Sequence, residues 1–404
     1  MTYQANRQTH HRLVLPLLCA AWVGLAGPAL AQGKAPVKVG VATSLTGPYV
    51  ELGEEVRRAV VYAVKEVNAR GGIDGRPVEA EYADSEGNPD VARRTAEKLT
   101  LKGYKLLVGP ISSAEGLAVG AQLDKWDALY LATINKSDRI TAESCNARMF
   151  RANHSDSMDM MVVGPWLKTR PERDWVIMAA DYAWGRDSAA AFTKAAQAAG
   201  KVVKAAYYAP MGTKDYAPYI QQLKGQNAQG MWVAIGGRDA VNFGVQADQF
   251  GLMKSVFAVS QSFAVPSTIK GMGPVAEGVW GVVNYALNLD TAQNRAWVAA
   301  WKKEYGREPA NFEAETYVGM QMLFAAVARA GSDDPEKVAR ALEGLSLDNT
   351  IYGKVTMRAA DHQLVMPNYI GKVAKVGGEL KPVIEMAVDS GHAMPAPSPE
   401  CKMN

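Results

Sequence analysis

Two serines, one arginine and two aromatic residues stand directly after short apolar runs that are typical of buried strands. Ser112 and Ser113 precede a helix-like segment, where free backbone N–H groups and the helix dipole favour an anion such as a carboxylate. Arg238 follows a double glycine, and a guanidinium there can hold a carboxylate through two parallel hydrogen bonds. Tyr182 and Trp184 can cover the face of a bound molecule. These residue types predict a binding site for a small carboxylate-bearing molecule.

The same residues also have structural interpretations, which the sequence leaves open: a helix cap, a surface salt bridge, and packing for one of the aromatic residues.

Signals for catalysis are weak. The histidines outside the N-terminal segment, His154, His362 and His392, lack the HExxH spacing of a metal site. The sequence contains no GxSxG elbow, no Walker loop and no GxGxxG motif after the first apolar run. It therefore predicts a binding protein without catalytic residues, metal or cofactor, and not an enzyme.

The elements that must position these residues follow an alternating pattern. From residue 37 to about 285, short apolar runs such as "VKVGVAT" alternate with amphipathic segments such as "EEVRRAVVYAVKEVNAR", and the pattern restarts after about residue 155 with "DWVIMAAD". This alternation predicts two mainly parallel sheets, each covered by helices. In such sheets ligands bind beyond the carboxyl ends of the strands, where the candidate residues stand. Long helices after about residue 290 and a strand-turn-strand section complete both lobes, so we expect the chain to cross between them more than once.

The first 31 residues have the three parts of a secretory signal peptide. Arg7 and Arg12 precede the apolar run "LVLPLLCAAWVGLAG", and the small residues "ALA" end it, which predicts export and cleavage after Ala31. A membrane anchor is the alternative, but the run falls short of the roughly 20 residues that a span needs. Cys19 does not indicate a lipoprotein, because a leucine precedes it. We expect the mature protein to be soluble, since no other apolar stretch is long enough to cross a membrane.

Charge and cysteine content restrict the partners and the compartment. With 44 Lys+Arg against 41 Asp+Glu, the chain lacks the basic excess of a nucleic-acid-binding protein. Cleavage would leave Cys145 and Cys401, and an even pair in an oxidising compartment predicts a disulfide. The bridge would tie the Pro-rich tail "PAPSPECKMN" to the body. Two unrelated thiols are the alternative.

Several segments together resemble one known family. These segments are "VNARGGIDGRPVEAEYADSEGNPDVARRTAEKL", "VGPISSAEG", "DYAWGRD" and "GTKDYAPYIQQLKGQNAQGMWVAIGGRDA". They are similar to periplasmic substrate-binding proteins of branched-chain-amino-acid-type (leucine/isoleucine/valine-binding-like) ABC transporters. The resemblance implies the α/β fold of a type I periplasmic binding protein, with two doubly wound parallel-sheet lobes joined by a three-strand hinge. The lobes would close on a small-molecule ligand and deliver it to the membrane permease of an ABC importer, with the protein acting as a monomer in the periplasm.

The resemblance also implies boundaries and contact residues. We expect a signal peptide at 1–31, a first lobe made of 36–154 and 285–362, a second lobe made of 155–284 and 363–388, and a tail at 389–404 tied to the first lobe. The implied ligand-binding residues are Tyr49, Leu52, Ser112, Ser113, Asn135, Lys136, Tyr182, Trp184, Arg238 and Gln261.

Several of these positions take their roles from the family. Ser113 matches the serine that binds the ligand's α-carboxylate in leucine-binding relatives, and the "INK" segment falls on the second carboxylate-binding loop. Trp184 takes the place of the aromatic residue that covers the ligand. Arg238 stands where a tyrosine is usual, and Leu52 stands near an aromatic wall position.

Gln261 is the most informative departure from the family pattern. It matches the glutamate that receives the ligand's ammonium in amino-acid-binding relatives, and an amide carries no charge to offset a buried ammonium. Lys136 and Arg238 meanwhile add positive charge to the expected cleft. Both changes favour an anionic ligand without an α-amino group, such as an aromatic or other organic carboxylate. If the match is displaced by a residue or two, Glu51 or Asp239 supplies the acid, so an amino acid remains the alternative.

Two other classes of protein compete with a transport receptor. A ligand sensor would use the same lobes without transport, but the chain carries no DNA-binding or signalling module. An exported hydrolase would turn over an ester or amide, and Ser113→Ala would abolish that turnover.

Overall fold

The structure, a computed structural model, describes residues 1, 2, 8 and 34–403. The expected signal peptide, including Cys19, lies almost wholly outside the described residues. All elements below belong to one compact unit, Ala35–Asn404. Among the described residues, no helix is long and apolar enough to span a membrane.

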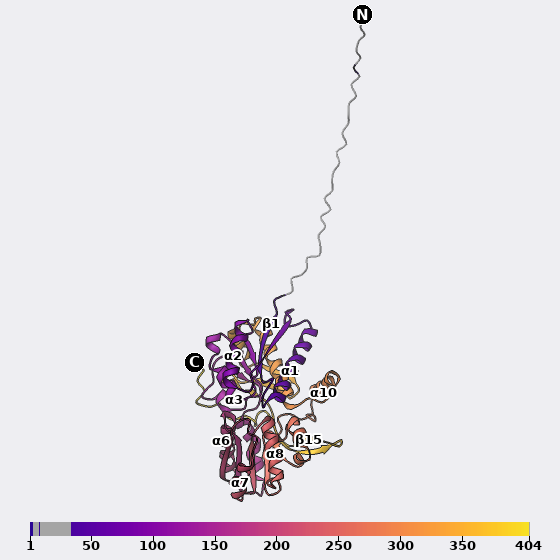
Figure 1. Cartoon of the computed structure of the whole chain (residues 1–404). Helices are drawn as coiled ribbons and strands as arrows, with labels where there is room; N and C mark the ends of the chain where they lie inside the picture. Colours follow the sequence, from indigo (N-terminus) through magenta and orange to yellow (C-terminus); the bar gives the residue numbers. More distant parts are fainter. Residues whose placement is uncertain (3–7, 9–33, 404) are drawn as a thin grey trace. The chain divides into compact units, whose positions relative to one another are not determined.

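The first lobe is built on a five-stranded sheet with the order β2-β1-β3-β4-β5, in which every neighbouring pair is parallel. Its strands are β1 (Val37–Thr43), β2 (Val78–Asp84), β3 (Leu106–Val108), β4 (Leu129–Ala132) and β5 (Met149–Arg151). Its helices from the same stretch of chain are α1 (Val50–Ala69), α2 (Pro89–Leu101), α3 (Ser113–Gly120), α4 (Leu123–Trp126) and the 3-10 turn η1 (Asp138–Thr141). Figure 1 shows β1 and helices α1, α2 and α3 gathered in this lobe.

The second lobe is built on a seven-stranded sheet with the order β15-β14-β10-β9-β8-β6-β7. Its strands are β6 (Asp174–Ala180), β7 (Val202–Ala209), β8 (Gly230–Ala234), β9 (Phe257–Ser260), β10 (Trp280–Val282), β14 (Asn368–Val376) and β15 (Glu379–Val388). Strands β6 to β10 pair in parallel, and β14 and β15 add an antiparallel edge. The helices are α5 (Asp156–Lys168), α6 (Ala183–Ala198), α7 (Ala217–Gly225), α8 (Gly237–Gln249), α9 (Pro266–Met272) and the 3-10 turn η2 (Gly273–Ala276).

The chain passes between the two lobes three times. The passages run from β5 to α5, from β10 to α10, and from β13 to β14. Between the second and third passages lie α10 (Ala292–Tyr305), α11 (Asn311–Ala330), α12 (Pro335–Leu342) and an antiparallel sheet of β11 (Ser346–Thr350), β12 (Gly353–Met357) and β13 (Leu364–Val365). This part rejoins the first lobe, because α11 packs on α1 and a bridge joins Arg151 to Gln363.

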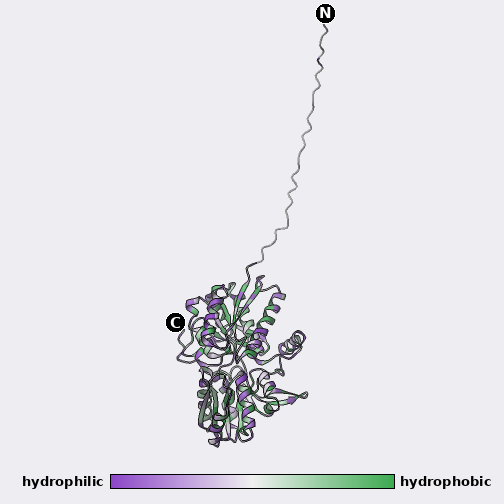
Figure 2. Cartoon of the chain, in the orientation of Figure 1, coloured by the Kyte–Doolittle hydropathy of each residue, from purple (hydrophilic) through white to green (hydrophobic). Residues whose placement is uncertain are grey.

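Helices cover both faces of each parallel sheet because the strands are apolar on both sides. In β3, Leu106 and Val108 pack with the apolar face of α1, whereas Leu107 points to the opposite face and packs with α2. In β6, Val176 and Ile177 divide between the two faces in the same way. Figure 2 shows hydrophobic residues along the strands and hydrophilic residues on the outward helix surfaces. The predicted α/β class with two lobes of mainly parallel sheet is confirmed.

The C-terminal tail is tied to the first lobe. Cys145 and Cys401 form a disulfide that joins positions 256 residues apart. The guanidinium of Arg358 also donates a hydrogen bond to the carbonyl of Pro395 at 2.9 Å, and Ala393 is fully buried. The predicted bridge is therefore present.

We expect the double variant Cys145→Ser/Cys401→Ser to lower the free energy of unfolding by about 2–4 kcal/mol, because an unfolded chain without the cross-link gains conformational entropy. Calorimetric melting of the oxidised protein, the reduced protein and the variant measures this difference. The reduced protein should melt with the variant, a few degrees below the oxidised form. Coincident melting of all three would contradict the prediction.

Candidate functional site: the cleft between the lobes

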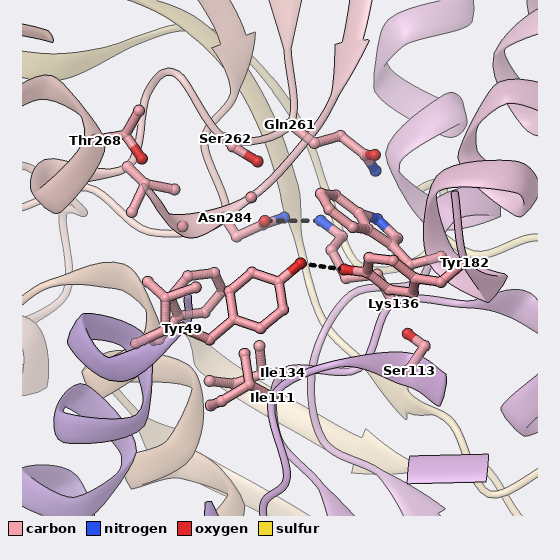
Figure 3. Close-up of a pocket in the computed structure, with 16 residues that line it drawn as sticks. Tyr49, Ile111, Ser113, Ile134, Lys136, Tyr182, Gln261, Ser262, Thr268 and Asn284 are labelled. Atoms are coloured by element: carbon pink, nitrogen blue, oxygen red, sulfur yellow. Dashed lines mark hydrogen bonds between the residues drawn. The ribbon is translucent and has the colours of Figure 1, made fainter. Parts of the chain in front are cut away.

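A cavity that is partly open to solvent lies between the lobes at the carboxyl ends of the strands. Its lining comes from both lobes and from the second passage between them (Figure 3). The lining residues are Tyr49, Leu52, Ile111, Ser113, Ile134, Lys136, Tyr182, Trp184, Gly236, Gly237, Gln261, Ser262, Val265, Thr268, Asn284 and Phe312.

The structure brings most of the candidate residues together at this cavity. Those in the lining are Tyr49, Leu52, Ser113, Lys136, Tyr182, Trp184 and Gln261. Ser112, Asn135 and Arg238 lie outside the lining. The acids considered as alternatives, Glu51 and Asp239, also lie outside it.

Two of the outlying candidates hold the loops that carry lining residues. Ser112 caps α3: its hydroxyl accepts the N–H of Glu115 at 3.2 Å, and the Glu115 carboxylate accepts the N–H of Ser112 at 2.9 Å. The buried amide of Asn135 donates to the carbonyls of Pro110 and Ile111 at 3.0 and 2.9 Å. These contacts fix the start of α3 and the loop after β4 against each other.

Arg238 joins the two lobes at the rim of the cleft. Its exposed guanidinium lies 3.1 Å from the carboxylate of Glu51, and its backbone N–H donates to the carbonyl of Pro48 at 3.2 Å. Asp239 is engaged within the second lobe, where it accepts the N–H of Gly212 at 2.7 Å. Arg238 and Glu51 therefore balance each other's charge.

Ser113 presents a hydrogen-bond donor to the cavity. Its hydroxyl oxygen accepts the backbone N–H of Ser137 at 3.1 Å, and the structure shows no acceptor for its hydrogen among the described residues. Ser113 is also the first residue of α3, whose leading N–H groups have no partner within the helix. A carboxylate oxygen at this point would find several donors.

Lys136 places a buried ammonium in the cavity wall. Its Nζ lies 2.6 Å from a carboxylate oxygen of Asp159. It also donates to the side-chain oxygen of Asn284 at 2.9 Å, as Figure 3 shows. Asp159 is fully buried and lies on α5, just after the first passage between the lobes. An ammonium has three hydrogens, so one remains for a ligand after these two contacts.

Gln261 is committed to the protein by both ends of its amide. Its Nε2 donates to Asp156 at 2.8 Å and to Asp159 at 2.6 Å, and its Oε1 accepts the hydroxyl of Ser188 at 2.5 Å. Burial, strengthened by nearby Asp138, raises the pKa of Asp156 well above its ordinary value. Gln261 therefore links the wall of the cavity to two buried acids and has no donor left for a ligand.

Aromatic and aliphatic side chains form the rest of the wall. Tyr49 of the first lobe and Tyr182 of the second share a hydrogen bond of 2.7 Å between their hydroxyls (Figure 3). Burial raises the pKa of both phenols, so both stay protonated. Trp184 lines the cavity with its indole N–H buried, and the described residues offer that group no acceptor. Gly237, at φ +59°, lies so close to Tyr49 that an added Cβ would come within 2.6 Å of the ring.

The sequence analysis missed several lining residues and the acids behind them. Asn284 and Ser262 stand just after strands β10 and β9, so the rule that ligands bind at strand ends covers them. Phe312 starts α11 and reaches the cleft only through the return of the chain to the first lobe, which no local pattern indicates. Asp156 and Asp159 are three residues apart in the first turn of α5, and this spacing puts them on one helix face.

Comparison with known proteins identifies the family. Residues 36–378 match the family described as periplasmic binding protein. The Leu/Ile/Val-binding protein homolog 4 of Brucella abortus (strain 2308) is 25% identical over 372 residues, which cover 88% of each chain. The chain belongs to the periplasmic binding protein family, whose members are solute-binding proteins without enzymatic activity. The predicted family is therefore confirmed.

Two solved structures show the same fold. One is a solute-binding protein of an ABC transporter from Rhodopseudomonas palustris BisB5 in complex with 3,4-dihydroxybenzoic acid, with a TM-score of 0.81 and 24% identity over 88% of this chain and 98% of that one. The other is the closed leucine-, isoleucine-, valine-, threonine- and alanine-binding protein from Brucella ovis, with a TM-score of 0.81 and 22% identity over 91% and 99% of the two chains. The type I periplasmic binding fold is confirmed.

Glu55 is a buried acid next to the part of the cavity wall that α1 and α11 contribute. Glu55 lies one turn after Leu52 and accepts the backbone N–H of Phe312. Burial, with the charge of Glu313, raises the pKa of Glu55 to about 8. Glu313 is itself fully buried and paired with Arg58 at 2.7 Å. Between the ordinary pKa of a glutamate and about pH 8, Glu55 therefore keeps its proton in the folded protein and loses it in the unfolded chain.

We expect Glu55 to make the free energy of unfolding fall as pH rises from about 5 to about 8. The native state binds more protons than the unfolded state in this window, and one such group changes stability by at most about 1.4 kcal/mol per pH unit. Denaturant unfolding at several pH values should therefore give a shallower decline for Glu55→Gln than for the unchanged protein. Parallel curves for the two proteins would show that Glu55 ionises normally.

Proposed function

We propose that the protein captures a small carboxylate-bearing ligand with an apolar body between its lobes and delivers it to the membrane permease of an ABC importer. The observation that carries this proposal is that free hydrogen-bond donors and apolar side chains line the same cavity. Ser113 and Lys136 each present a hydrogen to one end of the cavity. Most of the other side chains in the lining are apolar or aromatic.

The donors suit a carboxylate better than a neutral group. A carboxylate accepts hydrogen bonds through two oxygens, and bonds from charged or oriented donors to it are stronger than neutral ones. The ammonium of Lys136 and the hydroxyl of Ser113 come from adjacent strand ends of the first lobe, after β4 and β3. They can therefore hold one carboxylate together with the start of α3.

The apolar part of the lining suits an apolar ligand body. Its members are Leu52, Ile111, Ile134, Trp184, Val265 and Phe312. A branched aliphatic chain and an aromatic ring are both compatible with these surfaces. The two solved relatives bind ligands of both kinds by name, and each of those ligands carries a carboxylate.

Closure of the lobes would couple capture to delivery. Contacts across the cleft join Tyr49 to Tyr182, Glu51 to Arg238, and Arg139 to Asp187, the last at 3.2 Å. A ligand that touches both lobes favours the closed state by its additional contacts there. We further propose that the protein works as a monomer in the periplasm after removal of residues 1–31, and that the permease recognises the closed form.

We expect Ser113→Ala to weaken binding of a carboxylate ligand by about 10- to 100-fold, because a hydrogen bond to a charged group contributes about 1.5–3 kcal/mol. The mature protein is unfolded, refolded to remove any bound ligand, and screened by thermal shift against benzoate-type acids, aliphatic acids, amino acids and small amides. Calorimetric titration then gives the dissociation constant of each ligand that shifts the melting temperature.

Ser346→Ala is the matched control, because Ser346 lies on β11 outside the cavity lining. It should bind the ligand like the unchanged protein. If amides bind and carboxylates do not, the proposed ligand class is wrong. Turnover of an ester or amide that disappears in Ser113→Ala would indicate a hydrolase.

We expect Tyr182→Phe to shift the ligand-free protein towards an open arrangement, because it removes a hydrogen bond between the lobes that contributes about 0.5–1.5 kcal/mol. Small-angle X-ray scattering should show a larger radius of gyration for this variant without ligand, and the same radius as the unchanged protein at saturating ligand. Tyr104→Phe, which removes a hydroxyl from the first lobe beside Lys38, should have no effect. A radius unchanged by Tyr182→Phe would show that this contact does not hold the lobes together.

A further inference from the structure

Lys136 is the only cationic side chain among the described residues that line the cavity. Its ammonium is not a surface charge that turns into the cleft, because the residue is buried and two side-chain oxygens hold it. Asp159 at 2.6 Å balances its charge, and Asn284 at 2.9 Å fixes its direction. The protein thus builds an ammonium group into the wall of its own ligand site.

The acceptors around this ammonium are already occupied. One oxygen of Asp159 accepts from Lys136 and Gln261, and the other lies within 3.4 Å of the amide nitrogens of Asn284 and Asn368. The amide oxygens of Asn284 and Gln261 are engaged as well, by Lys136 and by Ser188. Both oxygens of Asp159 and the amide oxygens of Asn284 and Gln261 therefore have donors, whereas one oxygen of Asp156, farther behind Gln261, has none among the described residues.

The polar groups of the cavity lining that keep a free hydrogen-bonding position are mostly donors. Lys136 keeps one hydrogen, Ser113 keeps its hydroxyl hydrogen, and the buried indole N–H of Trp184 has no acceptor among the described residues. The hydroxyls of Ser262 and Thr268 also line the cavity, but a hydroxyl carries no charge. An α-ammonium would bring three more donors and a positive charge to a wall that offers few acceptors.

We propose that Lys136, held by Asp159, is a specificity-determining residue that makes the cleft select carboxylates without an α-amino group over the corresponding α-amino acids. This inference rests on the proposed function and names the ligand class of the same site. A ligand ammonium beside Lys136 would face the positive end of the Lys136–Asp159 pair and would find few free acceptors for its own hydrogens. A carboxylate alone gains the hydrogens of Lys136 and Ser113 without that cost.

Matched ligand pairs test the selectivity in the unchanged protein. The pairs are 4-methylpentanoate with leucine and 3-phenylpropanoate with phenylalanine, and they differ in the amino group alone. We expect the acid of at least one pair to bind tenfold or more tightly than its amino acid, a difference of about 1.4 kcal/mol. Equal or tighter binding of the amino acids would overturn the inference and leave the proposed function in place. If no carboxylate of either kind binds, the proposed function itself fails.

Two variants test whether Lys136 causes the selectivity. Lys136→Ala frees Asp159 and opens a space that a ligand ammonium can enter, so the preference for the acid should fall at least tenfold and can reverse. Lys136→Gln keeps a neutral donor beside Asp159 and Asn284, so it should fold even if the alanine variant does not. In Lys136→Gln the acid should lose more affinity than the amino acid.

The readout is the ratio of the two dissociation constants, which a general loss of stability does not change. Circular dichroism and melting temperature establish that each variant is folded before titration. An unchanged ratio in the folded variants would overturn the assignment of Lys136. A ratio that falls in both variants, or in Lys136→Gln alone where Lys136→Ala does not fold, would support it.

Discussion

The carboxylate of Asp159 is the constraint on which the rest of the cleft depends. It lies fully buried on α5, at the end of the first passage between the lobes. Lys136 reaches it from the first lobe and Gln261 from the second, at 2.6 Å in both cases. Asn284, on the second passage, and Asn368, at the end of the third, approach it within 3.4 Å. Asp159, at the end of the first passage, thus meets groups from both lobes and from the second and third passages.

A buried charge with this many partners restricts how the lobes can move. Removing any one donor would leave part of a desolvated carboxylate unpaired, which is costly, so the cluster should stay intact when the lobes open. The contacts farther out are of a different kind. The pair between Arg238 and Glu51 is solvent-exposed, and such pairs contribute little to stability. Motion is therefore most easily accommodated by breaking the outer contacts while Asp159 and its partners act as the pivot.

Much of the fold and part of the site could be predicted from the sequence. Continuous apolar runs alternating with amphipathic helices define two parallel sheets, and the rule that ligands bind at strand ends leads to the loops that carry Ser113 and Lys136. That rule locates loops but does not say which side chain of a loop faces inward. Ser112 and Asn135 are next to lining residues, yet they turn back to hold α3 and the loop after β4. Asp159 could not be found in this way, because it acts through contacts between residues more than 100 positions apart in the chain.

The charges of the cleft also show why residue types alone give an incomplete account of ligand preference. Counted from the sequence, Lys136 and Arg238 add two positive charges and Gln261 removes a negative one. In the structure, Asp159 and Glu51 balance both cations, so the cleft has no net excess of positive charge from these pairs. The proposed preference for a carboxylate rests instead on the hydrogens that remain free, those of Lys136 and Ser113. Asp159 accepts from Lys136, Gln261 and Asn284 and so draws them together, while Lys136 occupies the amide oxygen of Asn284 and keeps one hydrogen for the cavity.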